Sequence, residues 1–536
     1  MVSKHLSELF GGSVTALRFV KELRGFLRDP FDLDRELAGL RHQLATREES
    51  FVEVLRQGVF EKPTSPYRAL MRQAGISRED VEQLVGREGV EGALSILFDA
   101  GVRVSLDEFK GRRPIERSGL HLDVRASDFD NPLARSHFEA STGGSRGAGT
   151  RLMIDLDLLR YESIHLFLSL QSLGALDRPA GLWRPLPPGV TGIKELLYRA
   201  RIGRLPEVWF SQNRYHLRWE DARSATFALC ALGGSRLWGR PLAVPRYLPL
   251  ERAVEVAEWL AGRDGVEDAA LLDTNVSSAV RVCKAAIEAN LDISGTLFRT
   301  GGEPLTPARA EIVAETGSRV VCNYGIAEAG RLGLACGAPQ QLDDVHLLTD
   351  KIAVVQRPTA PFQGGPEFEA LWVTTLHPAT PKLMLNVEIG DYAERSSRHC
   401  ECALGQAGFG EHLHTIRSYE KLTSEGMHFV GSELMNLLEN VLPGRFGGGA
   451  NDYQLVEEEL DGLARVSLLV SPSVGPVSES EIRELVLDSL GRGGQGRAMM
   501  SQWWKESATL RVERREPLPT GAAKVLPLHV RKDAPR

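Results

Sequence analysis

The chain has 536 residues, of which 42% are hydrophobic and 25% are charged, a composition typical of a globular protein with room for more than one core. The net charge of -7, with 64 Lys and Arg interspersed among 71 Asp and Glu, provides no broad basic face and excludes nucleic acid as the default partner. Six scattered cysteines are too few for a disulfide framework, which favours a reducing, cytoplasmic location.

The first thirty residues combine helical spacing with charge. Arg18, Lys21 and Glu22 interrupt the uncharged apolar run that a secretory signal requires. No stretch of the chain approaches the roughly 18 to 20 apolar residues that span a bilayer, so we expect no membrane span. We interpret the segment as a helix packed on its own domain, with a membrane-surface or partner helix as the alternative. Its apolar positions at helical spacing are Val14, Leu17, Val20 and Leu23.

Helices and strands alternate over most of the chain. Residues 33–98 are predicted to be helical, with a capped start at Ser77, and residues 190–226 to be irregular and rich in strands. Further along, "LERAVEVAEWLAGR" and "SSAVRVCKAAIEAN" predict helices, whereas "AALLD" and "RVVCNYG" predict strands. This alternation indicates an α/β fold with layered sheets and helices.

The pattern changes after about Ile416. The order helix, strand pair, helix and strand in this last part is compact enough for a small α+β domain. We therefore predict a large domain over residues 1–417, of which 1–100 are a mainly helical lead-in, and a small C-terminal domain over residues 418–536.

A glycine-rich segment, "STGGSRGAGTR", runs from Ser141 to Arg151. Gly144 and Gly149 have the spacing of a nucleotide-binding P-loop, but Thr150 stands where that loop needs Lys. The flanking "SHFEA" and "RLMIDLD" alternate apolar and polar residues, which predicts a β-hairpin. Its tip could hold an anion with backbone amides, hydroxyls and one cation, and an exposed hairpin without a ligand is the alternative. The candidate residues are Ser141, Thr142, Gly143, Gly144, Ser145 and Arg146.

Further motifs follow the hairpin in a fixed order: "RTGGEPL" (299–305), "NYGIAEAG" (323–330), "EIGDYAE" (388–394) and "PTGAAKVLP" (519–527). This ordered set resembles the adenylate-forming, acyl-CoA synthetase-like superfamily, and within it the phenylacetate-CoA ligase branch with its acyl-protein synthetase relatives. The resemblance implies an AMP-binding large domain and a mobile small domain. It also implies that ATP and a carboxylic acid form an acyl adenylate, whose acyl group then passes to a thiol or an amine.

The resemblance assigns roles to individual residues. Tyr324 and Gly325 would border the adenine, and Asp391 would accept hydrogen bonds from the ribose, for which an ionised carboxylate is well suited. Gly302 and Glu303 would line the nucleotide pocket. In addition, Glu328 would hold the Mg²⁺ that bridges the phosphates, and Lys524 would bridge the carboxylate and the phosphate during adenylation.

Three departures from the family pattern stand out. Arg146-Gly147-Ala148 occupies the place where relatives usually have Gly-Lys-Pro, so Arg146 would supply the cation as a planar donor. The hinge segment "TIRSYEKLTSEG" offers Arg417 and Lys421 in an altered register. Finally, two alanines separate Gly521 from Lys524 in the last motif.

A second constellation contains cysteines. Cys336, His346, Cys400 and Cys402 have the composition of a closed structural Zn²⁺ site, and some members of the phenylacetate-CoA ligase branch similarly hold zinc between these regions. His399 competes as the nitrogen ligand. The alternative is a set of reduced thiols beside an unrelated histidine. A nucleophilic cysteine is disfavoured, because outside this group no Cys adjoins an activating His.

Together these features predict an ATP- and Mg²⁺-dependent ligase that activates a small carboxylic acid, with an aromatic or medium-sized acid suggested by the family. Coenzyme A is the first choice of acceptor, and an amine or a carrier-protein thiol is the alternative. A non-catalytic scaffold that keeps the ligase fold is the other hypothesis, and a homodimer stays open. The acid pocket would draw on "LWGRPLAVP", "DTNVSS" and the residues flanking Gly301.

Overall fold

The protein is described here from a computed structural model. The described residues are 19–135, 138–141, 151–186, 191–212, 222–238, 240–262, 269–359, 368–418, 423–424, 427–428, 431–460, 463–491, 510–519, 525 and 528–531. Within these ranges, every helix is too short or too polar to cross a bilayer.

The N-terminal lead-in is helical, as predicted. Residues 19–28 form a helix that buries Phe19, Leu23 and Phe26 in the core beneath the large sheet, which confirms packing on its own domain. Ser77 makes the predicted capping box with Asp80. The elements that follow the first helix are α2 (Leu33–Ala45), α3 (Arg47–Leu55), the π-helical turn η1 (Arg56–Phe60), α4 (Pro66–Gln73), α5 (Arg78–Asp99) and α6 (Leu106–Phe109).

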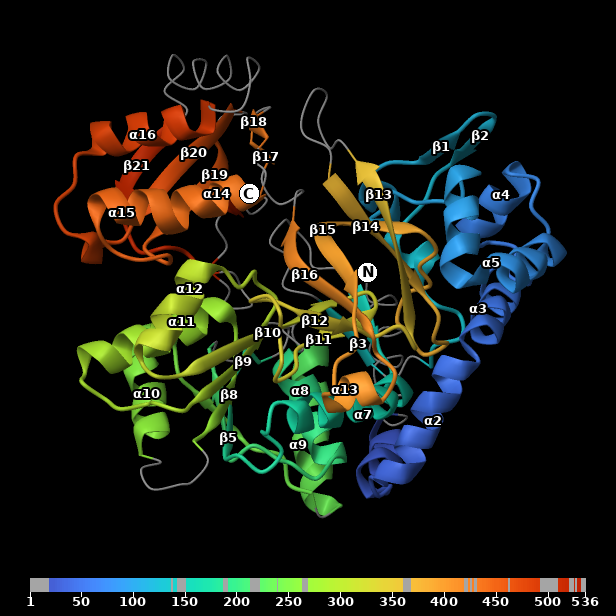
Figure 1. Ribbon diagram of the computed structural model, residues 1–536, viewed down its shortest axis with the longest axis horizontal. Coiled ribbons are helices and arrows are strands. Elements are labelled where there is room, and N and C mark those ends of the chain that lie inside the picture. The colour runs from blue at the N-terminus through green and yellow to red at the C-terminus, as the bar shows by residue number, and fades with distance from the viewer. Residues whose placement is uncertain are drawn as a thin grey trace, which may run out of the picture.

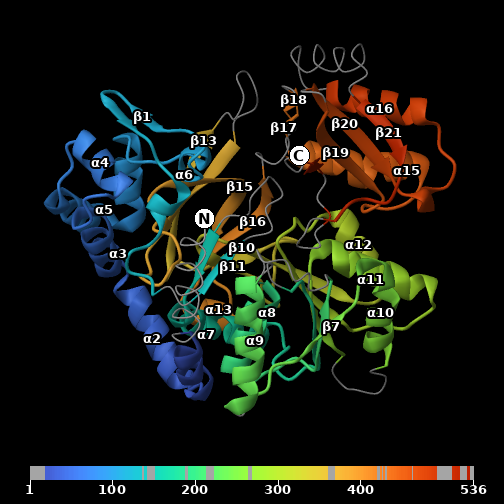
Figure 2. The same ribbon diagram turned by 180° about the vertical axis from the view of Figure 1, so that it is seen from behind.

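Twelve strands of the described chain form one large sheet with the order β13-β14-β15-β16-β12-β11-β10-β9-β8-β5-β6-β7 (Figures 1 and 2). From β10 to β7 all neighbours are parallel, whereas from β10 to β13 all are antiparallel. The parallel half consists of β5 (Ala180–Trp183), β6 (Val208–Ser211), β7 (Pro245–Tyr247), β8 (Leu271–Asp273), β9 (Leu297–Gly301) and β10 (Arg319–Ile326). The antiparallel half adds β11 (Gly330–Leu334), β12 (Val345–Leu347), β13 (Ile352–Thr359), β14 (Phe368–Thr375), β15 (Val387–Ser397) and β16 (Glu411–Ser418).

Both faces of the parallel half are covered by helices, which is why its strands are short apolar runs. Successive residues alternate between two cores: Leu271 packs with α7 and α8, and Leu272 packs with α10 and α11. Figure 1 shows the green helices α8 and α9 on one side of these strands and α10 and α11 on the other. These helices are α7 (Leu156–Ser172), α8 (Thr191–Arg201), α9 (Ala222–Leu237), α10 (Ala253–Ala261, after the 3-10 turn η4 at Leu250–Arg252), α11 (Val276–Glu288) and α12 (Pro307–Glu315).

One prediction for this region is wrong. The residues described between 191 and 226 are not mainly irregular strands, because α8, β6 and the start of α9 lie there. Ile193, Leu196, Leu197 and Ala200 are buried at helical spacing in the core shared with α7. Gly192 and the basic residues obscured that period in the sequence.

The antiparallel half packs against the lead-in helices. Residues of α3, α4 and α5 share one core with β13, β14 and β15. Two hairpins flank this half, and one of them confirms the prediction for the glycine-rich segment, since β3 pairs antiparallel with β4. The small elements are β1 (Ile115–Arg117), β2 (Leu120–Leu122), the 3-10 turn η2 (Ala126–Phe129), β3 (Phe138–Ser141), β4 (Arg151–Ile154) and α13 (Ala403–Gln406).

The C-terminal part has its own sheet, of order β21-β20-β19-β22, and its own core. In Figure 1 this orange and red unit lies beside α11 and α12. Two ion pairs join it to these helices, Lys284 to Asp452 at 2.9 Å and Arg309 to Glu439 at 3.0 Å. Its elements are β17 (Thr423–Ser424), β18 (Met427–His428), α14 (Gly431–Asn436), η5 (Leu437–Val441), α15 (Leu442–Phe446), β19 (Tyr453–Leu460), β20 (Leu463–Val470), η6 (Pro472–Val474), α16 (Glu479–Gly491), β21 (Leu510–Arg514) and β22 (Leu528–Arg531).

Candidate active site and metal centre

The strand β10 is the seam between the two halves of the sheet, and the Tyr-Gly motif lies where its pairing changes. Residues 319–323 pair parallel with β9, and residues 324–326 pair antiparallel with β11, with a register shift between Tyr324 and Gly325. A Cβ on Gly325 would lie 2.9 Å from the carbonyl oxygen of Gly330, so only glycine allows this close approach. The irregularity therefore fixes where the Tyr324 side chain leaves the sheet.

Two of the predicted nucleotide-binding residues meet beside this seam. The Tyr324 hydroxyl donates a hydrogen bond to Oδ2 of Asp391 at 2.8 Å, although 67 residues separate them in sequence. Asp391 is mostly buried on β15, directly after Gly390, whose φ of +76° requires the left-handed region that glycine favours. A buried carboxylate with one hydroxyl donor has acceptor capacity left for a second polar ligand.

Glu303 binds the start of a helix, whereas the sequence predicts that it lines the nucleotide pocket. It follows Gly302, whose φ is +80°, at the end of β9. Its buried carboxylate accepts hydrogen bonds from the backbone N–H and the hydroxyl of Ser277, at 2.7 and 2.9 Å. The carboxylate of Glu303 thus places a negative charge at the first turn of α11. The backbone N–H groups of this turn have no partners within the helix, so a negative charge here is favourable. Glu303 shapes this edge of the sheet, and its role toward a nucleotide stays a prediction.

Ser277 also connects Glu303 to the C-terminal unit. Its hydroxyl oxygen accepts a hydrogen bond from the Val525 N–H at 3.4 Å, and its carbonyl accepts one from Asn451 at 3.2 Å. Val525 pairs with Pro519 in an isolated bridge. The residue that follows Lys524 in the sequence therefore lies against the end of the parallel sheet.

Several predicted site residues lie outside the described residues: Thr142, Gly143, Gly144, Ser145, Arg146, Lys421 and Lys524. Ser141 is the last residue of β3 and pairs with Arg151. The other hinge residue, Arg417, forms an ion pair with Asp343 at 2.8 Å near the end of β16.

Glu328 lies in the turn between β10 and β11. Its carboxylate forms an ion pair with Lys110, which follows α6 just after the lead-in. Both side chains are largely buried. Sequence reasoning missed Lys110, because 218 residues separate the pair and a lysine at the end of a short helix carries no distinguishing pattern. A divalent cation at Glu328 would have to share this carboxylate with Lys110 or displace it.

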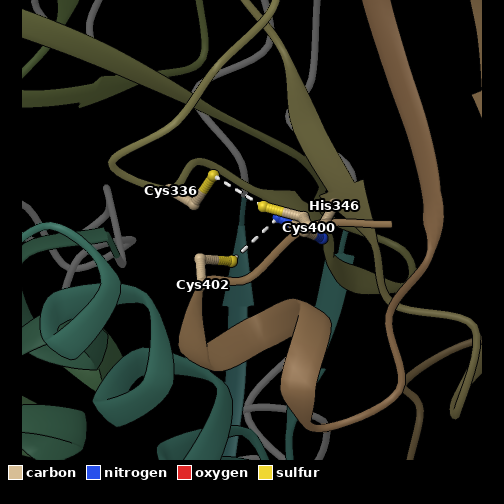
Figure 3. A group of neighbouring side chains, drawn as sticks. All are labelled: Cys336, His346, Cys400 and Cys402. Carbon is tan, nitrogen blue, oxygen red and sulfur yellow. Dashed lines mark hydrogen bonds between the residues drawn. The ribbon is translucent and has the colours of Figure 1, made fainter. Parts of the chain in front are cut away.

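The cysteine constellation is assembled as predicted, and it includes His346 instead of the exposed His399. The ligand atoms of Cys336, His346, Cys400 and Cys402 all lie within 4.8 Å of one another. Figure 3 shows the four side chains pointing toward one another, with Cys336 Sγ 4.0 Å from Cys400 Sγ and Cys402 Sγ 3.2 Å from His346 Nε2. Tetrahedral zinc with ordinary bond lengths separates its ligand atoms by about 3.5 to 3.8 Å, so the donor set fits zinc.

The surroundings of these ligands suit a metal as well. His346 Nδ1 donates to the carbonyl oxygen of Phe409 at 2.7 Å, which leaves Nε2 directed at the cluster. The Gly405 N–H donates to Cys402 Sγ at 3.4 Å, and a Cβ on Gly405 would lie 1.9 Å from the Cys400 carbonyl oxygen. The Cys336 thiol and the Cys402 thiol share one hydrogen bond, which lowers the pKa of Cys402 and raises the pKa of Cys336, so the first of the two to ionise is Cys402.

The remaining cysteines make poor nucleophiles. Burial raises the pKa of Cys283 and of Cys322 to about 12, so both are protonated at neutral pH. Burial also raises the pKa of Cys230. These shifts agree with the sequence interpretation that an acyl-cysteine is disfavoured.

No protein-family model matches the sequence, and no curated protein matches it. Among solved structures, two of 2-hydroxyisobutyryl-CoA ligase in the postadenylation state are similar, one in complex with R3-HIB-AMP and one with 2-HIB-AMP. Each has a TM-score of 0.52 and 15% identity, and the match covers 91% of this chain and 89% of the ligase chain. The likeness confirms the predicted fold class, an α/β protein with a large layered domain and a smaller C-terminal domain.

Proposed function

We propose that this protein is an ATP-dependent ligase that activates a carboxylic acid as its acyl adenylate, in the phenylacetate-CoA ligase branch of the adenylate-forming superfamily. The observation that carries the proposal is the meeting of Tyr324 and Asp391 beside β10, next to the turn that presents Glu328. The shared fold supports it, because the similar CoA ligase was solved with an acyl adenylate.

In the first half-reaction an oxygen of the acid carboxylate attacks the α-phosphorus of ATP. The bond from that phosphorus to the bridging oxygen breaks, and pyrophosphate leaves. Both reactants are anions, so the reaction needs cations and N–H donors around them. Tyr324 and Asp391 would bind the adenosine, Arg146 and the hairpin amides the pyrophosphate, and Lys524 the carboxylate and phosphate.

Glu328 would hold Mg²⁺, together with the phosphate oxygens. The ion supplies positive charge that offsets the charge developing on the leaving pyrophosphate. Lys110 forms an ion pair with this buried carboxylate, so a metal bound at Glu328 would compete with Lys110 for it.

In the second half-reaction a thiol attacks the acyl carbon, its proton leaves to solvent or a base, and AMP departs. Coenzyme A is the acceptor we favour, and a carrier-protein thiol or an amine is the alternative. The Ser277 contacts with Val525 and Asn451 supply a place where the small domain could dock and release between the two steps.

We further propose that Cys336, His346, Cys400 and Cys402 hold a structural Zn²⁺. Four protein ligands leave no open position for water or substrate, so the ion would stabilise the fold and take no part in the chemistry.

A panel of acids tests the proposal. Each acid is incubated with ATP, Mg²⁺ and hydroxylamine, and AMP and hydroxamate are measured. We expect both products from at least one acid, because hydroxylamine intercepts an acyl adenylate without the natural acceptor. If no acid gives AMP and hydroxamate although the protein still binds ATP, the scaffold hypothesis is favoured. Adding coenzyme A, amines or carrier proteins to a responsive acid then identifies the acceptor.

A further inference from the structure

A cluster of charged side chains lies beneath the turn that carries Glu328, and its cations outnumber its anions. Among the described residues, its anions are Glu162, Glu195 and Asp273. Asp350 adjoins them through Lys351 and hydrogen-bonds to His165 at 2.7 Å. The six cations are Arg184, Lys194, Arg199, Arg299, Arg331 and Lys351.

The cluster forms where one face of the parallel sheet changes from apolar to charged. On the α8 side, Leu271 is followed two residues later by Asp273, and Leu297 by Arg299. Arg184 follows β5 in the same way. These positions are at the carboxyl ends of parallel strands, where α/β proteins bind their ligands.

The acidic residues are already shared among several cations. Asp273 pairs with Arg299 and with Arg184, the latter at 2.7 Å. Glu195 pairs with Arg299 at 3.0 Å, Arg331 at 2.9 Å and Arg199 at 3.2 Å. With Asp350 counted, four anions face six cations, so two positive charges are left without an acidic counterpart within the described part of the cluster.

Four of the cations have unused donors, and one of these donors is the buried Nε of Arg299, which has no hydrogen-bond partner in the described chain. Buried nitrogens of Arg199 (Nη2) and Arg331 (Nη1) have no hydrogen-bond partner in the described chain, and the Arg199 side chain is only 2% exposed. Lys194, which is half-buried, makes no hydrogen bond or ion pair with any residue that the structure describes. Burial, opposed by Glu162, lowers the pKa of the Lys194 ammonium, and burial likewise lowers the pKa of Arg199 despite Glu195. Unpaired buried charge is costly unless a ligand compensates it.

These donors are next to the proposed site. The Arg331 backbone N–H donates to Glu162 at 3.2 Å, and Lys351 donates to the Ala329 carbonyl oxygen at 2.9 Å. Residues 329–331 directly follow Glu328. The Arg331 guanidinium lies 4.0 Å from the ring centroid of Tyr198 on α8 and pairs with Glu195 on the same helix at 2.9 Å.

We infer that the acid activated by this protein is doubly anionic: a dicarboxylic acid whose second carboxylate binds Lys194, Arg199 and Arg331. This inference rests on the proposed ligase function and specifies its substrate class. Guanidinium groups bind a carboxylate through two parallel hydrogen bonds, which suits them better than an apolar tail. A monocarboxylic acid would cover these cations without neutralising them.

Matched pairs of acids test the inference. Glutarate is compared with pentanoate, adipate with hexanoate, and isophthalate with benzoate, in the hydroxamate assay; 3-phosphonopropionate tests whether a phosphonate serves as the second anion. In the wild type we expect kcat/KM to be about tenfold or more higher for the dicarboxylate, the worth of one charged hydrogen bond. In Lys194→Met this preference should shrink, because the KM for each dicarboxylate should rise more than the KM for the matched monocarboxylate.

Lys62→Met is the matched control, because Lys62 lies in the lead-in between η1 and α4 and forms no ion pair with any member of the cluster in the described chain. Lys194→Gln provides a second variant if Lys194→Met is unstable in thermal unfolding. The inference would be overturned if the wild type had equal kcat/KM for both acids of each pair, or if Lys194→Met lowered kcat/KM equally for both acids. Either result would leave the ligase function standing. If no acid yields hydroxamate, the ligase function fails, and calorimetric binding of glutarate to the wild type but not to the variants still decides the charge preference.

Discussion

The cysteine–histidine cluster and the nucleotide-site residues are built in opposite ways. Cys336, His346, Cys400 and Cys402 fall within 67 residues of sequence, and their ligand atoms lie within 4.8 Å of one another. The nucleotide-site residues come from the segment just after the lead-in, the seam of the sheet and β15, and they meet in separate pairs, Tyr324 with Asp391 and Lys110 with Glu328.

The difference reflects what each site has to do. Four protein ligands fill all coordination positions of a zinc ion, and the bound ion holds the segments that carry these ligands in place. A catalytic site needs groups that can exchange partners, so its charges are held by temporary partners such as Lys110 on Glu328. We therefore expect changes at the cluster to alter stability and changes at the nucleotide site to alter rate.

The largest effect should follow the loss of the metal. Cys400→Ala should lower the free energy of unfolding by about 4 kcal/mol or more, because the remaining ligands lose their common ion. Protein purified without chelator should contain stoichiometric zinc, and the variant should contain none. Cys230→Ala, a half-exposed cysteine outside the cluster, is the matched control. Substoichiometric zinc in the wild type, or an unchanged unfolding midpoint in Cys400→Ala, would reject the site.

Lys524→Ala should lower the rate of adenylation and leave the stability of the protein nearly unchanged. We expect acid-dependent pyrophosphate exchange to fall by about 100- to 1,000-fold, the usual cost of removing one group that stabilises developing charge. The thermal midpoint should stay near that of the wild type. Undiminished exchange would remove Lys524 from the adenylation step. Retained transfer from a synthetic acyl adenylate to coenzyme A would place the defect in the first half-reaction.

Lys110→Met tests whether the Glu328 carboxylate changes partners. Without the competing ammonium, the Mg²⁺ concentration for half-maximal adenylation should fall several-fold, while Lys110→Arg should resemble the wild type. Lys62→Met, in the lead-in, serves as the control. An unchanged or increased Mg²⁺ requirement in Lys110→Met contradicts a metal at Glu328 in competition with Lys110.

The smallest effect is expected from Tyr324→Phe. It removes the hydroxyl that donates to Asp391 at 2.8 Å and leaves the ring, so the apparent affinity for ATP should fall by about five- to tenfold, near the worth of one hydrogen bond. Tyr392→Phe, on the same strand as Asp391, is the comparison variant. Equal ATP affinities of wild type and Tyr324→Phe would show that Asp391 binds without help from this hydroxyl.

Sequence reasoning worked best where signals are local. The Ser77 capping box, the hairpin around the glycine-rich segment and the strand before Tyr324 are encoded by neighbouring residues, and all are confirmed. It failed over residues 190–226, where the buried face of α8 is defined by α7 and the sheet more than by its own composition. It also missed Lys110, whose partner Glu328 is 218 residues away, and it named the segment that contains Ser277 without its contact to Glu303.

The sequence by itself determined the α/β class and the three cysteines of the Cys/His set, with His346 or His399 as the nitrogen ligand, because periodicity and residue chemistry need no knowledge of the fold. Only the tertiary structure decided which residues meet across the seam of the sheet. It selected His346 over His399, brought Lys110 to Glu328, and gathered Lys194 and five other cations into one cluster. Such choices depend on contacts between segments up to hundreds of residues apart, which strand order and packing create and local sequence does not record.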